Sequence, residues 1–586
     1  MLQLILILIP MLASLVLVAL IDDKTIRSGY IAVAGALASL IFSLYYFSVL
    51  GGGTAVAVYS WFYIGSFNFQ VSTLSSYVSV FATIIVSFIS LMVIIFSLFY
   101  MKKEPQKRYY AEMSLFVFSM LGLVISDSLL LLYVFWELVG ISSFLLIGFY
   151  YEREKAAAAA NKALIMTRIG DMALFAAIVI LFVNYGTLSL TFILSNLQLL
   201  SSGMLLLVAS LVTIAAISKS AQFPFYPWLP DAMEGPTTVS ALLHSATMVA
   251  AGAYILILLS PLLSSAGMGT VISVIAIITA FIGAFLALHV VDMKRILAYS
   301  TIESLSFMFL AIGSLNAGGA LYYLITHAIF KSLLFLITGA LMVFFGTQDI
   351  RKLGTKGLQN SWLFLPFLAG ILSLAGFPPF MGFFAHLTLS HAFGVYGQAL
   401  FVVLSFLTSL FAFRLLFTVF RSGALPSKKM YYTLSSALPI FLLAAITLFG
   451  GISLFYMYGL INASYSLDVS TLIDLIASFV GVLSAFWLFG SVNRNYWVSR
   501  LSSFADSLSS FSYNVILQLI GASVVYLGRS FADFDDALTS FYESVAKYSL
   551  ILSFKSRRIE DGDVQTYISV MLIGLIIVLA VAVVFL

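Results

Sequence analysis

The sequence has no cysteine and few charged residues. None of its 586 residues is cysteine, and Asp, Glu, Lys and Arg together make up 9% of the chain. Without cysteine the chain cannot form disulfides, thiolate nucleophiles, thiolate-ligated iron–sulfur clusters or cysteine-type zinc sites. Because 62% of the residues are hydrophobic, the composition is that of a polytopic membrane protein and excludes an ordinary soluble one.

Ligand-binding motifs are also missing. The sequence holds no phosphate-binding loop, nucleotide fingerprint or haem motif. The two histidines of HLTLSH at 386–391 have the wrong spacing for one helical face and no carboxylate nearby. We therefore expect no metal, no cofactor and no nucleic-acid partner for this chain.

Apolar runs of about 20 residues predict an all-α protein with about sixteen transmembrane helices. The N-terminal run has no basic segment and no small-residue cleavage site, which predicts a retained first helix. The expected spans lie near 2–21, 29–50, 74–100, 111–126, 128–150, 163–184, 203–222, 237–260, 268–290, 295–314, 317–346, 361–390, 397–421, 434–459, 471–490 and 564–586.

Two of these spans, 203–222 and 361–390, are predicted to be broken helices. Pro224, Pro227 and Pro230 follow the first apolar run, and a helix interior does not tolerate such a series. Broken helices occur at membrane depth where they line protein or a cavity. We therefore expect the first helix to break just after Lys219.

The basic residues indicate the orientation of the chain in a cell membrane. The loops 51–73, 185–202, 261–267, 391–396 and 460–470 contain no lysine or arginine, whereas the alternate loops are rich in them. The positive-inside rule then places the N-terminus outside.

The segment between Arg500 and Asp563 differs from the spans. Leu501, Phe504 and Leu508 begin an apolar stripe at helical spacing, with serines and other polar residues between its members. This pattern predicts a lateral amphipathic helix on the cytoplasmic membrane surface, followed by an anchoring span.

A short motif occurs twice. AQFPF at 221–225 in the first broken helix is answered by AGFPPF at 375–380 in the second, five spans later. Five is an odd number, so the two units would lie inverted in the membrane. Inverted repeats with broken helices are typical of transporters and mark the path of the transported ion.

Several ionisable residues lie inside predicted spans, where charge is costly and usually functional. Glu137 lies between long uncharged stretches, and Lys219 ends an apolar run. Each could be a structural ion-pair partner, but we favour a proton relay, because lysine changes its proton affinity when a carboxylate approaches or leaves. Glu303 is also expected to be buried, and the sequence does not indicate its partner.

Histidines extend this pattern. His327 and Lys331 are four residues apart and share one helical face. His244 lies within another apolar run, and each histidine could be a relay or a satisfied interior residue. Arg168 and Asp171, three apart near a helix end, could simply pair with each other or support the relay.

Long strings of this chain resemble the antiporter-like subunits of respiratory complex I, especially the large distal L-type subunit, which corresponds to mitochondrial subunit 5. The strings cover roughly 110–390, and their combined specificity is high. They are LLLLYVFWELVGISSFLLIGFYY, TRIGDM, SKSAQFPFYPWLPDAMEGPTTVSALLHSATMV, DMKRILAYST and THAIFKSLLF.

The resemblance implies roles for individual residues. Glu137 and Lys219 match the family's buried acid–lysine pair, and Asp171 matches a supporting acid. His244 matches a bridging histidine. His327 and Lys331 match the central relay.

Two positions depart from the family pattern. The family usually has a lysine followed by an acid in the second broken helix, whereas this chain has His386 followed by Leu387. Tyr323 stands where the family often has a second histidine. We expect His386 to replace the terminal lysine and to release its proton more readily, because histidine holds a proton less tightly than lysine.

The resemblance also implies an architecture: a fourteen-helix core with two inverted five-helix repeats. The expected parts are N-terminal helices at 1–110, half-channels at 111–262 and 263–422, core helices at 423–498, the lateral helix at 499–563 and the anchor at 564–586.

The function implied is that of a proton-translocating membrane subunit of a complex I-like quinone oxidoreductase. FMN, iron–sulfur clusters and quinone would belong to partner subunits, and paralogous antiporter-like subunits would be neighbours in the bilayer. The alternatives are a subunit of a multisubunit cation/proton antiporter and a subunit of a membrane-bound hydrogenase. A purely structural strut would not need so many buried charges.

Overall fold

The computed structural model describes residues 2–20, 27–49, 55–64, 67–354, 361–390, 395–420, 431–453 and 468–489, together with 544, 547 and 548. The chain divides into two units, Met1–Ser510 and Phe511–Leu586. The predicted lateral helix and anchor, 499–563 and 564–586, fall almost wholly outside the described residues and stay predictions.

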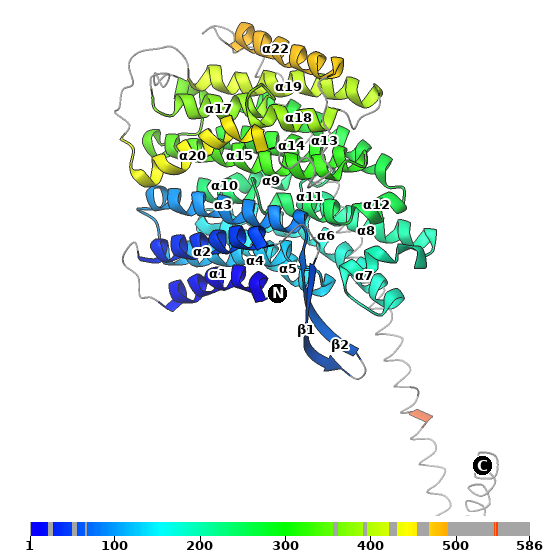
Figure 1. Cartoon of the computed structure of the whole chain (residues 1–586). Helices are drawn as coiled ribbons and strands as arrows, with labels where there is room; N and C mark the ends of the chain where they lie inside the picture. Colours follow the sequence, from blue (N-terminus) through cyan, green and yellow to red (C-terminus); the bar gives the residue numbers. More distant parts are fainter. Residues whose placement is uncertain are drawn as a thin grey trace, which may run out of the picture. The chain divides into compact units, whose positions relative to one another are not determined.

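The described part of the first unit is mainly helical (Figure 1). Its N-terminal region contains α1 (Leu2–Leu20), α2 (Arg27–Val49), the strands β1 (Ala55–Ile64) and β2 (Phe67–Ser75), α3 (Tyr77–Tyr100) and α4 (Gln106–Val124). There follow α5 (Leu129–Ile147), α6 (Glu154–Tyr185), α7 (Leu190–Ser195), α8 (Ser202–Lys219), α9 (Trp228–Asp231), α10 (Thr237–Leu243), α11 (Met248–Leu258) and α12 (Ser260–Ser265).

The second half begins with α13 (Gly269–His289), α14 (Met293–Gly313), α15 (Ala317–Phe345) and α16 (Ile350–Leu353). It continues with α17 (Phe364–Leu374), α18 (Met381–Ser390), α19 (Val395–Val419), α20 (Leu434–Phe449) and α22 (Val469–Phe489). Helix α15 is central, because it contacts α3, α10, α11, α14, α17, α18 and α20.

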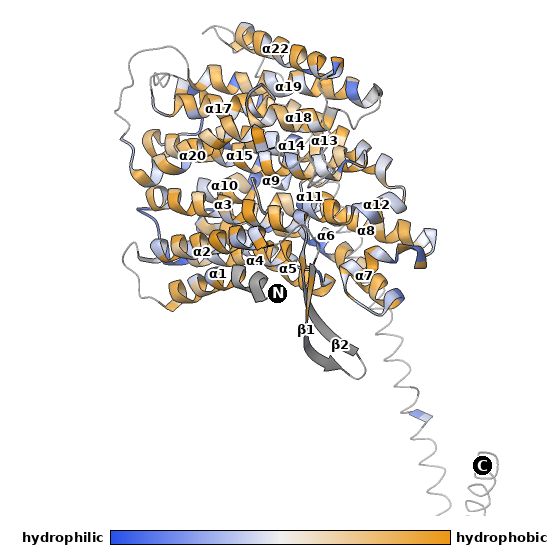
Figure 2. Ribbon diagram, viewed as in Figure 1, coloured by the Kyte–Doolittle hydropathy of each residue, from blue (hydrophilic) through white to orange (hydrophobic). Residues whose placement is uncertain are grey.

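The helices confirm a multi-pass membrane protein. Within the described residues, twelve helices are long and apolar enough to cross a membrane. Helical elements also overlap each predicted span from 2–21 to 471–490 within the described residues. Apolar residues run along the lengths of these helices (Figure 2), as a bilayer requires.

One predicted outer loop, 51–73, contains strands that the sequence analysis did not predict. Within 51–73, residues of β1 and β2 form an antiparallel hairpin. The reason lies in the sequence AVAVYSWFYI and FNFQVSTLS, which is rich in β-branched and aromatic residues. Two such runs separated by a short Gly-Ser connection predict a hairpin.

A second correction concerns the helix break. Helix α8 ends at Lys219 as expected, but the span 237–260, predicted to be intact, is interrupted between α10 and α11. Hydroxyl groups replace the lost backbone bonds there: Ser245 Oγ donates to the Ala241 carbonyl at 2.5 Å, and Thr247 Oγ1 donates to the Leu242 carbonyl at 2.6 Å. Such side-chain bonds compete with the helical ladder.

The repeated motif forms the same turn twice. Ala221 and Gly376 both have positive φ, +50° and +72°. The next amide then reaches back five residues, from Gln222 to the Ile217 carbonyl at 2.8 Å and from Phe377 to the Leu372 carbonyl at 2.9 Å. The two broken helices therefore end in a common hydrogen-bonding pattern, centred on the first residue of AQFPF and on the second residue of AGFPPF.

A carboxylate holds the hairpin against the start of α5. Asp127 is fully buried and accepts hydrogen bonds from Ser72 Oγ at 2.9 Å, from Ser189 Oγ at 3.0 Å and from the Thr191 amide at 3.0 Å. The Thr191 hydroxyl donates to it as well. One side chain thereby joins β2, the α4–α5 connection and α7.

We expect Asp127→Asn to destabilise the protein, because hydrogen bonds to a charged group contribute about 1.5–3 kcal/mol each and the amide can accept fewer of them. The thermal unfolding midpoint of the purified complex should fall. Ser195→Ala on α7 is the control, since the Ser195 hydroxyl donates to the Thr191 backbone carbonyl. An unchanged midpoint in Asp127→Asn would refute this role.

Candidate functional site

A buried ion pair lies at the end of α8. The side chain of Lys219 is fully buried, and its Nζ lies 3.2 Å from Asp171 Oδ1 on α6. Lys219 Nζ also donates to the Trp136 carbonyl at 3.4 Å and stands 4.9 Å from the centroid of the Trp136 ring. Trp136 Nε1 donates to the same carboxylate oxygen at 2.5 Å. A lysine charge at membrane depth is expensive, and here three contacts offset that cost.

Glu137 has a different partner from the one predicted. The sequence predicted that Glu137 and Lys219 would lie within one ion-pair contact or one water of each other. In the structure Glu137 Oε2 accepts from Arg168 Nη1, and Lys219 forms its ion pair with Asp171. The suggested pairing of Arg168 with Asp171 is likewise replaced. The reason is the helical register: Trp136 and Glu137 point in different directions from α5, so the two acids each meet a separate cation.

The ion pair between Glu137 and Arg168 is less enclosed than the pair of Lys219. The side chains of Glu137 and Arg168 are 17% and 42% exposed. Glu137 Oε1 is nevertheless buried and has no hydrogen-bond partner. Glu137 therefore belongs to the more exposed of the two ion pairs, with one of its oxygens enclosed.

Gly140 leaves space for the ammonium group. A Cβ at this position would lie 3.2 Å from Lys219 Nζ and 4.0 Å from Asp171 Oδ2. The helix α5 thus presents backbone rather than a side chain where α8 brings in its charge.

His244 lies in the break between α10 and α11. Its ring is fully buried, and neither ring nitrogen has a hydrogen-bond partner. The neighbouring Ser245 carbonyl, freed by the break, lies 3.1 Å from His327 Nδ1 on α15. The break therefore holds one buried imidazole without a hydrogen-bond partner, that of His244, and binds another, that of His327.

Lys331 and Glu303 form the centre of the second half. Lys331, one turn beyond His327, donates to Ser300 Oγ on α14. Glu303 lies one turn further along α14 and accepts from Thr408 Oγ1 at 2.6 Å, while its other oxygen is buried without a partner. The structure thus supplies the neighbours of Glu303 that the sequence left open.

Gln222 connects the two halves. It follows the break at Lys219, and its Oε1 accepts from Ser306 Oγ on α14 at 2.9 Å. Ser306 is one turn from Glu303. The polar residues around α8 and those around α14 and α15 therefore belong to one buried series.

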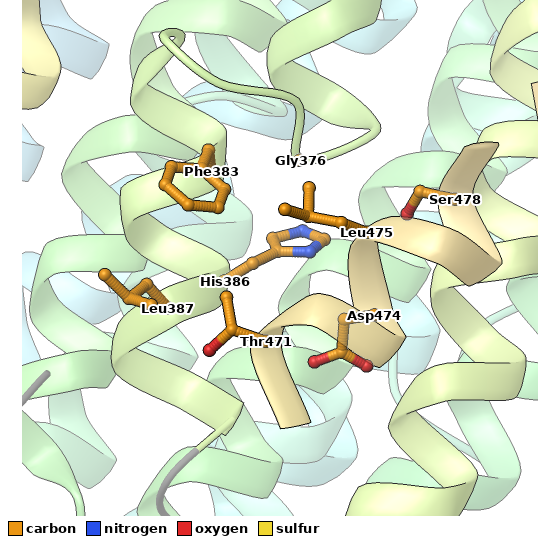
Figure 3. A pocket seen from close by; sticks show the side chains of 8 residues that line it. All are labelled: Gly376, Phe383, His386, Leu387, Thr471, Asp474, Leu475 and Ser478. Carbon is orange, nitrogen blue, oxygen red and sulfur yellow. The ribbon is translucent and has the colours of Figure 1, made fainter. Parts of the chain in front are cut away.

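His386 ends this series on α18. Its ring stacks on Tyr323 of α15, with centroids 5.8 Å apart, and meets Phe401 edge-on at 5.4 Å. Tyr323 is one turn before His327, so it lies between the central histidine and the terminal one. Figure 3 shows His386 in a small cavity that Asp474 of α22 also lines.

Sequence reasoning missed two residues. Asp474 stands within the predicted span 471–490, and its position among apolar residues was the signal that could have found it. Lys294 was counted as an inner-loop cation, but it is buried and donates to the carbonyls of Met233 and Gly235. It therefore fixes the segment between α9 and α10.

The arrangement consists of side chains that can each hold a proton. Lysine, histidine and carboxylate side chains follow one another through the interior, and each can hold a proton. Among the described residues, no group of three metal-binding side chains occurs. Fold and site together define a multi-pass membrane protein with a buried ionisable path, the class that includes ion-translocating subunits.

Comparison with known proteins narrows the class. Residues 126–412 match the family model described as NADH:quinone oxidoreductase/Mrp antiporter, and residues 61–111 match that of the N-terminus of complex I chain 5. NADH-quinone oxidoreductase subunit L of Campylobacter jejuni is 41% identical over 67% of both chains. Subunit L of Buchnera aphidicola is 33% identical over 88% of both chains. This chain belongs to the subunit L (chain 5) family of NADH-quinone oxidoreductases.

Solved structures agree with this fold. A chain of the Mrp complex from Dietzia superposes with a TM-score of 0.68 at 25% identity, covering 100% of this chain and 63% of that one. A chain of an archaeal membrane-bound sulfane sulfur reductase superposes with a TM-score of 0.69 at 19% identity, covering 83% of this chain and 99% of that one. The second likeness shows the fold alone.

We expect Gly140→Ala to weaken the Lys219–Asp171 pair, because the new methyl would stand against the ammonium. A loss near 1 kcal/mol would slow a step through this pair about five-fold. Gly148→Ala is a matched control, since its Cβ would meet the Ala160 methyl at the same 3.2 Å without touching a charge. Equal proton translocation by both variants in proteoliposomes would contradict the expectation.

Proposed function

We propose that this chain carries protons through the membrane along Glu137, Lys219, His244, Lys331 and His386. Asp171 and Arg168 support the first part of this path, and His327 supports its centre. The observation that carries the proposal is the enclosure of the Lys219–Asp171 pair, which is fully buried and is followed by further buried ionisable groups. Ionisable residues at membrane depth are characteristic of proton relays.

The Lys219 pair can act as a switch. While Asp171 stays beside the ammonium, the charged form of Lys219 is stabilised. When the carboxylate turns toward Arg168 and Glu137, the buried ammonium loses its partner and gives up its proton. The acceptor that we propose is His244, whose two ring nitrogens have no hydrogen-bond partner. His327 and Lys331 then receive the charge on α15.

The chain is a membrane subunit of a proton-translocating quinone oxidoreductase of the complex I type. Electron transfer would take place in partner subunits that hold FMN, iron–sulfur clusters and quinone. Paralogous antiporter-like subunits would adjoin this chain in the cell membrane. The N-terminus would lie outside, and the helix 499–563 would run along the cytoplasmic side.

The paired breaks support an inverted repeat. The turns at Ala221 and Gly376 match in hydrogen bonding, and α6 and α15 both end at a left-handed glycine with φ +65°, Gly186 and Gly346. We infer two five-helix units, 111–262 and 263–422, within a core that ends near 498. Each unit would form one half of the proton path around its broken helix.

A cation/proton antiporter subunit is a second candidate, favoured by the likeness to the Dietzia Mrp complex. The identity to subunit L sequences is higher, at 41% and 33%. Quinone-dependent proton uptake in proteoliposomes would support the first function. Sodium/proton exchange without quinone would support the second.

We expect Lys219→Ala to leave the complex assembled and to reduce proton translocation strongly, because the path loses the group that holds its proton. Proton translocation and quinone reduction are measured together in proteoliposomes. Lys162→Ala is the matched control, since Lys162 forms a half-buried ion pair with Asp231 at 2.7 Å. Loss of assembly in Lys219→Ala would favour a structural role instead.

Deleting 501–586 should weaken the association of this subunit with its neighbours. The deletion removes the amphipathic stripe that begins at Leu501, Phe504 and Leu508, which would contact the neighbouring subunits. Co-purification with the other membrane subunits measures the effect. Full yield of the truncated subunit in the complex would show that the segment is not needed for assembly.

A further inference from the structure

A small cavity lies where α22 packs against α18 (Figure 3). Two ionisable side chains line it: His386 comes from α18 and Asp474 comes from α22. Leu387, the residue after His386, lines the same cavity. The other lining side chains are apolar or hydroxylic, so His386 and Asp474 are the ionisable residues among those that line this cavity.

One polar atom of each side chain lacks a hydrogen-bond partner. His386 Nε2 and Asp474 Oδ1 are buried, and neither atom has a hydrogen bond. A buried polar group without a partner costs about 1–3 kcal/mol, and more when it is charged. An imidazolium N–H donates and a carboxylate accepts, so each group supplies what the other lacks. The cavity of about 10 Å³ is close to the space that one water needs to join them.

We propose that Asp474 is the acid of the terminal proton site and acts together with His386. This inference rests on the proposed proton path. In that path the residue after His386 would be an acid by family resemblance, but it is Leu387. The structure offers a carboxylate to the same cavity from another helix, so α22 supplies the charge that α18 lacks.

The proton transfer from His386 to Asp474 needs no reactant other than water. Protonated His386 donates its Nε2 proton to the Asp474 carboxylate, directly or through one water, which leaves a neutral imidazole and a carboxylic acid. The acid then releases the proton to water and returns to the carboxylate. One proton moves, and no bond other than N–H and O–H changes.

The position of Asp474 suits release. Helix α22 begins at Val469, so Asp474 lies about 7.5 Å along its axis at 1.5 Å per residue. The loop 460–470 before it is predicted to be outside. Asp474 therefore lies near the end of α22 that is predicted to face the receiving surface, whereas Leu387 cannot bind a proton.

Six variants in the intact complex test this inference: Asp474→Asn, Asp474→Glu, His386→Ala, His386→Lys, Ser478→Ala and the double variant Asp474→Asn/Leu387→Asp. Protons translocated per quinone reduced are measured in proteoliposomes. Asp474→Asn should lower this ratio about tenfold, as His386→Ala should, while Asp474→Glu and His386→Lys retain it. Ser478→Ala, which alters the same cavity without removing a charge, should pump like the unaltered protein.

The double variant separates a proton-carrying role from a structural one. It returns an acid to the same cavity from α18. The number of protons translocated per quinone reduced should then recover to at least half of the value for the unaltered protein. If Asp474→Asn pumps normally while Lys219→Ala does not, the inference is wrong and the proposed path stands. If both pump normally, the path itself is wrong. If Asp474→Asn does not assemble and Leu387→Asp restores neither assembly nor pumping, Asp474 is structural and the inference is overturned.

Discussion

The structure depends on the cost of placing charge inside a bilayer. Lys219 can be fully buried because Asp171, the Trp136 carbonyl and the Trp136 ring surround its ammonium. Removing one partner of such a pair leaves an uncompensated charge, which costs far more than the pair contributes. The packing of α5, α6 and α8 is therefore tied to this contact, and the same contact makes the site responsive to any movement of Asp171.

Helix breaks meet a related requirement for the backbone. Each break frees amide and carbonyl groups that lipid cannot satisfy. At Ala221 and Gly376 a left-handed residue lets the chain bond back onto the helix, and between α10 and α11 serine and threonine hydroxyls take that role. The carbonyl of Ser245, which the break frees, binds His327 Nδ1. The broken segments thus pair backbone groups that the breaks free, while both ring nitrogens of His244 stay without a hydrogen-bond partner.

Sequence patterns predicted helix positions well because the bilayer imposes length and apolarity on each span. They placed Lys219 at a helix end, and α8 does end there. They failed for partners: Glu137 binds Arg168 and not Lys219. Pairing depends on the rotation of neighbouring helices, which tertiary packing decides. The break at His244 was also missed, because most of the residues 237–260 are apolar or small and none of them is proline.

Asp474 illustrates why sequence position alone is a weak guide to a proton site. Electrostatic interaction depends on distance and on the surrounding medium, and not on which helix carries the charge. In a low-dielectric interior a carboxylate on α22 can act on His386 as well as one on α18, provided that both enter the same cavity. The substitution of an acid by Leu387 therefore need not remove the acid from the site. A search limited to aligned positions would find a loss there, whereas the packing of α22 against α18 supplies a replacement.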